Sequence, residues 1–150
     1  MKKSILKDLD MNDGMAVTLA MLKAHPMQYL GVIGLDQKPK VKAFEFKYEE
    51  NGKLWFDTIR GKETWKEILQ NPEVELTVAD SETMDWIRIS GKVRIQEDEE
   101  HRQKAFAASP ILRKYYSGPE AKKVVPFTLD NVQVEVASLE PDIGTHIYRL

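Results

Sequence analysis

The sequence of 150 residues contains no cysteine, which excludes disulfide bonds, thiolate metal sites and a cysteine nucleophile. Its three histidines, His25, His101 and His146, do not follow metal-ligand spacing and have no evident carboxylate partner along the chain. We interpret them as ordinary surface or loop residues. The 22 basic and 24 acidic residues give a net charge of −2, so the composition offers no case for nucleic-acid binding.

Long apolar runs are also missing, so nothing in the sequence predicts a membrane span. Residues 1–10 start with basic side chains but lack the apolar segment of a signal peptide, and we therefore expect a cytoplasmic protein. The length suits one domain with a sizeable core. Because the sequence shows neither a repeat nor a linker, we assign residues 1–150 to a single domain.

The stretch from Pro39 to Val93 is the most informative part of the chain. Residues 40–48 alternate charged and apolar side chains, which predicts a strand with one buried face, and residues 53–57 are its predicted partner. Between them, Asn51-Gly52 supplies the left-handed backbone of a tight turn. The sequence therefore predicts a β-hairpin.

A short helix is predicted next, over residues 63–70, and Pro72 ends it. Thr58, Gly61 and Lys62 lie at its start, where unpaired N–H groups and the helix dipole favour an anion. A structural interpretation competes, in which Thr58 ends a strand, Gly61 makes a turn and Lys62 is solvated. The local residues favour that interpretation, although a lysine in a first turn is unfavourable for the dipole and makes a bound anion more plausible.

The other elements follow the same periodicities. Gly91 interrupts one long strand and predicts a bulge where the sheet curls. We expect helices over 13–24, 97–108 and 111–116, and strands over 29–35, 73–79, 84–95 and 127–136.

Several motifs in this order resemble the pyridoxamine 5'-phosphate oxidase-like FMN-binding split-barrel superfamily, over roughly residues 14–136. They are Pro-Lys-Val-Lys-Ala-Phe (39–44), Gly-Lys-Leu-Trp-Phe-Asp-Thr (52–58), Gly-Lys (61–62), Leu-Gln-Asn-Pro (69–72) and Trp-Ile-Arg-Ile-Ser-Gly-Lys-Val (86–93). The resemblance implies a mainly β fold with flanking helices, a six-stranded antiparallel split β-barrel. It also implies a homodimer that binds FMN at the subunit interface.

The resemblance assigns cofactor roles to particular positions. Lys42 and Lys62 would hold the FMN phosphate, and Asp57 and Thr58 would lie beside the ribityl chain and the phosphate. Lys42 stands where the family usually has arginine, so a point charge replaces a planar two-point fork.

The remaining cofactor positions surround the ring. The backbone of Val41, Ala43 and Phe44 would border the isoalloxazine, and Trp86 would approach it from the other subunit.

Two further residues are candidates for substrate binding. Arg88 shares a strand face with Trp86 and faces either solvent or a ligand across the dimer. Tyr115 could lie over the flavin or a substrate. The simpler interpretation of the Tyr115-Tyr116 pair is that one tyrosine packs and the other lies on the surface.

The leading hypothesis is a small FMN-dependent oxidoreductase that acts on a small electron acceptor, including a nitroaromatic compound as in the nitroimidazole-resistance members of the superfamily. A pyridoxal vitamer fits less well, because the segment after the last expected strand is short. The alternative is a flavin or small-molecule binding protein without turnover, such as a sensor. A third option is haem or a deazaflavin in the same cleft, although no axial ligand is evident.

Overall fold

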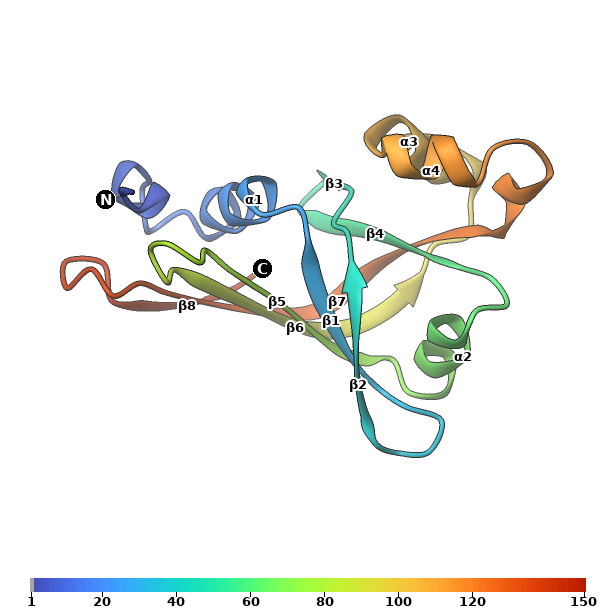
Figure 1. Cartoon of the computed structure of the whole chain (residues 1–150), viewed down its shortest axis with the longest axis horizontal. Helices are drawn as coiled ribbons and strands as arrows, with labels where there is room; N and C mark the ends of the chain where they lie inside the picture. The colour runs from blue at the N-terminus through green and yellow to red at the C-terminus, as the bar shows by residue number, and fades with distance from the viewer. Residues whose placement is uncertain (1) are drawn as a thin grey trace.

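The computed structural model describes residues 2–150 and contains eight strands in one sheet (Figure 1). The strands are β1 (Gln28–Ile33), β2 (Pro39–Phe44), β3 (Tyr48–Glu50), β4 (Lys53–Ile59), β5 (Glu73–Ala79), β6 (Trp86–Ile95), β7 (Val124–Ala137) and β8 (Thr145–Arg149). The helices are α1 (Gly14–Ala24), α2 (Glu63–Gln70), α3 (Glu99–Ala108) and α4 (Pro110–Tyr115), with 3-10 helices η1 (Ile5–Asp8) and η2 (Gly118–Lys123).

All strand pairs are antiparallel, in the order β2-β1-β5-β6-β7-β4-β3. The long strand β7 pairs with β4 through its first half and with β8 through its last residues. A register shift between Ser90 and Lys92 shows the bulge that Gly91 predicted. None of the helices between residues 2 and 150 is long and apolar enough to cross a membrane.

The predicted class is confirmed, since the chain is mainly β with flanking helices, but the count of six strands is wrong. Residues 40–48 form two strands rather than one, and β8 had no clear signal in the sequence. The chain leaves the sheet after Phe44 because Phe46 turns into the core, where its N–H donates to Oε1 of buried Gln28 at 2.7 Å. This side-chain hydrogen bond replaces a ladder bond and separates β2 from β3.

The predicted hairpin is therefore shorter than expected. Only β3 pairs with β4, and Asn51 (φ 54°) and Gly52 (φ 74°) form its turn as predicted. The strand β2 pairs with β1 instead.

The strand β2 presents its side chains in an unusual order. Lys40, Lys42 and Phe44 are half-buried, whereas Val41 and Ala43 are exposed. The two lysines thus share the inward side with Phe44, which leaves Lys42 at the side of the molecule where α2 packs.

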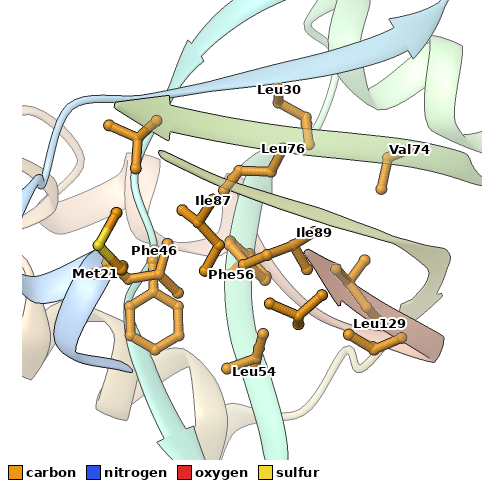
Figure 2. Close-up of a cluster of buried hydrophobic side chains, with 14 of the residues drawn as sticks. Met21, Leu30, Phe46, Leu54, Phe56, Val74, Leu76, Ile87, Ile89 and Leu129 are labelled. Atoms are coloured by element: carbon orange, nitrogen blue, oxygen red, sulfur yellow. The ribbon is translucent and has the colours of Figure 1, made fainter. Parts of the chain in front are cut away.

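The main core lies between the curled sheet and α1 (Figure 2). In β5 and β6, Leu76, Ile87 and Ile89 are fully buried, and Leu76 pairs directly with Ile89. Met21 of α1 and Phe56 of β4 extend this cluster. Each such side chain contributes roughly 1.5–3 kcal/mol when fully buried, so this cluster holds the curled sheet together.

A smaller core lies under α3 and α4, which form a pair at one end of the molecule (Figure 1). Ala105, Leu112 and Val124 form its centre. This packing fixes α4 beside the ends of β2 and β4.

Candidate functional site

A cavity of about 330 Å³ lies where the ends of β2 and β4 and the start of α2 approach α4. Its volume is within the range of small-molecule sites. The lining residues are Pro26, Met27, Lys42, Ala43, Phe44, Glu45, Lys47, Asp57, Thr58, Ile59, Lys62, Thr64, Ser109, Ile111, Leu112 and Tyr116. Apolar side chains from four segments thus share this cavity with a dense set of charged and hydroxyl groups.

The structure brings together six of the residues predicted to bind the cofactor. They are Lys42, Ala43, Phe44, Asp57, Thr58 and Lys62. They come from β2, β4 and the loop before α2. The two strands are not neighbours in the sheet, and the curl of the sheet brings their ends to one cavity.

Two predicted cofactor residues, Val41 and Trp86, do not line this cavity. Val41 is 71% exposed on the outward face of β2. Residues opposite one another in antiparallel strands share a face, and the register aligns Ala43, Tyr29, Thr77 and Arg88 across four strands. Because Trp86 is two residues from Arg88, it lies on the same outward face.

The two candidate substrate residues also lie outside the cavity. Arg88 pairs with Glu135 at 3.2 Å, and its guanidinium lies 4.5 Å from the Trp86 ring centroid. Tyr115 is 63% exposed, whereas its neighbour Tyr116 packs on the smaller core and lines the cavity. The tyrosine in the cavity is thus Tyr116, because the turn of α4 directs Tyr115 toward solvent.

One end of the cavity has the donors of an anion site. The α2 residues after Lys62 have free first-turn N–H groups, since Lys62 at the N-cap makes no side-chain capping hydrogen bond. Thr58 and Thr64 add hydroxyls. The Lys62 ammonium donates to the Tyr116 hydroxyl at 2.7 Å and so lies across the cavity mouth. This end can hold a phosphate.

Lys42 reaches the same end but already has acidic partners on α2. Its Nζ lies 3.0 Å from Oε1 of Glu67 and 3.9 Å from Oε2 of Glu63. The Glu67 side chain is completely buried, whereas that of Glu63 is 66% exposed. This ion pair joins residues 25 positions apart, and local patterns could not predict it.

A second polar cluster lies at the other side of the cavity. The Lys47 ammonium is 2.6 Å from Glu45 and 3.5 Å from Asp57, and the Ser109 hydroxyl donates to Glu45 at 2.8 Å. Burial raises the pKa of Asp57 to about 6, although Lys47 opposes the rise. Burial alone would raise the pKa of Glu45, but hydrogen bonds from Lys47 and Ser109 hold it below its usual value.

The Oδ2 atom of Asp57 has no hydrogen-bond partner among the described residues. A buried carboxylate oxygen of this kind is costly unless a ligand donates to it. The family resemblance placed Asp57 beside the ribityl chain and the phosphate, where an acid is unfavourable. The structure directs the acid toward Lys47 instead.

His101 does not fit the prediction of an ordinary surface histidine without carboxylate partners. Its ring stacks on Trp55 with centroids 3.8 Å apart, and its two nitrogens lie 2.8 Å from Asp98 and 2.8 Å from Glu50. Burial would lower the pKa of His101, but these hydrogen bonds outweigh it and raise the pKa. Asp98 is three residues away from His101, so this contact could be predicted from the sequence. Glu50 is remote in sequence and is brought to His101 by the hairpin of β3 and β4. His25 also approaches a carboxylate, with its Nε2 3.7 Å from Asp80.

The donor set fits FMN at this cavity. Two lysines, two threonine hydroxyls and the first-turn amides of α2 suit a phosphate, and Met27, Phe44 and Ile111 offer apolar surface for a ring. Oδ2 of Asp57, which has the Lys47 ammonium at 3.5 Å but no close hydrogen bond, offers an acceptor for a hydroxyl or N–H group. Residues 2–150 contain no group of three or more acidic or histidine side chains arranged to hold a metal ion.

The fold and the cavity define a small antiparallel β protein with a ligand site at a helix start. The family model for pyridoxamine 5'-phosphate oxidase matches residues 17–137, so the chain belongs to this family. Comparison with the curated proteins gives no match.

Solved structures confirm the predicted split-barrel fold. A NimC/NimA family protein from Clostridium acetobutylicum is 27% identical, with a TM-score of 0.79 over 92% of this chain and 94% of that chain. General Stress Protein 26 from Bacillus anthracis is 20% identical, with a TM-score of 0.67 over 88% of this chain and 95% of that chain. A heme binding protein from Mycobacterium smegmatis is 12% identical, with a TM-score of 0.65 over 85% of this chain and 55% of that chain.

Proposed function

We propose that this chain is an FMN-binding protein and a small flavin-dependent oxidoreductase that acts on a small electron acceptor. The observation that carries the proposal is the cavity at the start of α2, where Lys62, Thr58 and Thr64 converge beside an apolar wall. Membership of the pyridoxamine 5'-phosphate oxidase family supports it. The cytoplasmic location stays a prediction from the sequence.

The chain's own residues would bind and orient the cofactor. Lys62 and the N–H groups of α2 would hold the phosphate, Phe44 and Met27 would pack on the ring, and Asp57 would accept a hydrogen bond. FMN would supply the electron transfer when bound, so no side chain has to act as a nucleophile.

We also propose that the protein is a homodimer, in which the outward sheet face meets the same face of a second copy. The support is that Val41 and Trp86, both expected at the flavin, lie on that face, together with Ala43, which also lines the cavity with the other five. Val41 and Tyr29 expose apolar surface there, at 71% and 46%. A symmetric dimer would bring each Trp86 to the partner's site.

The visible spectrum and the mass in solution test this proposal together. The purified protein is mixed with FMN, freed of excess cofactor and examined by absorbance and light scattering. We expect a yellow dimer with one FMN per chain. A colourless protein that does not retain FMN would overturn the flavin assignment.

Turnover is tested separately, with the protein that has bound FMN. We expect NADH or NADPH to reduce the bound flavin and a nitroaromatic compound to reoxidise it, because the sequence resembles nitroimidazole-resistance proteins of the superfamily. Retention of FMN without either reaction would favour the alternative, a binding protein or sensor. No histidine of the described chain lines the cavity, so a haem there would need another axial ligand such as Tyr116 or Met27.

A further inference from the structure

A buried anion lies behind the phosphate end of the cavity, in contact with Lys42. The carboxylate of Glu67 is fully buried on α2, and neither of its oxygens has a hydrogen-bond partner among the described residues. The Lys42 ammonium, 3.0 Å from Oε1, compensates this charge. An isolated buried carboxylate is very costly, so the pair must stay together while the cavity is empty.

This pairing changes the charge that a phosphate would meet. Lys42 and Lys62 both line the cavity, and two freely available ammonium groups would favour a phosphate dianion strongly. Glu67 neutralises Lys42 at 3.0 Å, and the attraction is strong because little water surrounds the buried carboxylate. Lys62, which donates to the neutral Tyr116 hydroxyl, keeps its charge for the ligand.

We infer that Glu67 is a specificity-determining residue that weakens the cavity's preference for phosphorylated over unphosphorylated flavin by holding Lys42. The ligand class is then flavin with or without its phosphate, so that riboflavin also binds this cavity, with an affinity within about 100-fold of that of FMN. Glu67 acts through Lys42 and does not itself line the cavity. The inference rests on the proposed flavin site.

The test compares the dissociation constants of FMN and riboflavin, measured by flavin fluorescence, in the wild type and in Glu67→Gln. Glutamine keeps the shape of the side chain and removes its charge. We expect the preference for FMN over riboflavin to rise about tenfold, the size of one charge-assisted hydrogen bond, while riboflavin affinity stays unchanged. An unchanged preference would overturn the inference.

Two further variants show whether the effect passes through Lys42. Glu63→Gln is the matched control, because this carboxylate lies one turn away at 3.9 Å but is 66% exposed and screened by water. It should change the preference less than threefold. In the double variant Lys42→Gln/Glu67→Gln the gain should disappear; a gain that persists would assign the effect to general charge and overturn the role of Lys42.

The wild-type protein gives an independent test if Glu67→Gln does not fold. With one compensated lysine, FMN should be preferred over riboflavin by less than about 100-fold, since one charge-assisted contact contributes that much at most. A stronger preference would overturn the inference. Failure of both flavins to bind would instead remove the proposed function, and the inference with it.

Discussion

Lys62 is the lysine at the phosphate end whose recorded partner is neutral, the Tyr116 hydroxyl at 2.7 Å. We predict that Lys62→Ala weakens FMN binding by about 1.5–3 kcal/mol, because a charge-assisted contact to the phosphate is lost. Riboflavin, which lacks the phosphate, should lose much less. Fluorescence titration with both flavins measures the difference.

The control for Lys62 is Lys66→Ala, an exposed lysine on the same helix that does not line the cavity. It should leave both affinities unchanged. If Lys62→Ala behaves like this control, Lys62 is a solvated first-turn residue, as the simpler interpretation of the sequence held.

Asp57 gives a prediction about pH. Its pKa is about 6 in the folded protein, above the ordinary 3.8, so the folded state binds this proton more tightly than the unfolded state. The stability that Asp57 contributes is therefore complete below pH 3.8 and is lost as the pH rises through 6. The loss is on the order of 3 kcal/mol.

We predict that Asp57→Asn makes the ligand-free protein more stable than the wild type at pH 8, and that the difference shrinks toward pH 4. Lys47 keeps Glu45 as a partner in this variant. Urea unfolding at several pH values measures the free energy of unfolding. Asp142→Asn, an exposed acid, is the control, and a parallel pH dependence of wild type and Asp57→Asn would contradict the prediction.

The role of a residue could be predicted from the sequence where it depends on residues nearby in the chain. It could not be predicted where it depends on contacts that form only in the folded protein. The hydroxyl and lysine at Thr58 and Lys62 were visible because they precede a recognisable helix. The resemblance supplied Lys42, but neither it nor the local pattern showed that Glu67 holds this lysine. That contact exists because β2 turns the side that carries Lys42 toward α2.

At the scale of elements, a regular period was sufficient to predict a helix or strand, whereas the irregular connections between strands could not be predicted. The bounds of α2 and β5 match the sequence prediction, since each combines a clear period with a flanking proline or turn. Residues 40–48 also alternate, apart from the apolar pair Ala43-Phe44, yet they form two strands. The break depends on buried Gln28, which accepts from the Phe46 N–H and is remote in sequence.

The hairpin of β3 and β4 is connected to α3 by His101, which bridges Glu50 and Asp98. Because these contacts raise the pKa of His101, protonation favours the folded state. The stabilisation is complete below the ordinary pKa of 6.5 and is lost as the pH rises through the raised value. The hairpin and α3 should therefore be joined most firmly in mildly acidic solution.

We predict that His101→Phe, which keeps an aromatic ring over Trp55, lowers the free energy of unfolding by about 1–2 kcal/mol at pH 6. The cost should shrink toward pH 9, because rising pH removes the proton from the wild-type imidazole. Denaturant unfolding at the two pH values measures it. An equal cost at both would show that packing, and not the ion pairs, connects the hairpin to α3.

At the scale of the whole molecule, the predicted cofactor residues divide between two faces. Lys62 lies at the cavity, and Trp86 lies on the outward face of the sheet. The proposed dimer explains this division, because a two-fold axis would combine the cavity of one subunit with the Trp86 of the other. The fold of one chain could be predicted from its sequence, whereas in the proposed dimer the complete site would combine residues of two copies.

Subunit exchange tests this arrangement directly. We predict that Trp86→Ala weakens FMN binding by about 0.5–1.5 kcal/mol, the contribution of an aromatic stack. When Trp86→Ala is mixed with Lys62→Ala under exchanging conditions, each mixed dimer should contain one site with both native residues and one site with neither. FMN titration should then show a class of sites with wild-type affinity that is absent from either variant alone. If the two residues act within one chain, no native site can form, and the mixture should bind as weakly as the separate variants.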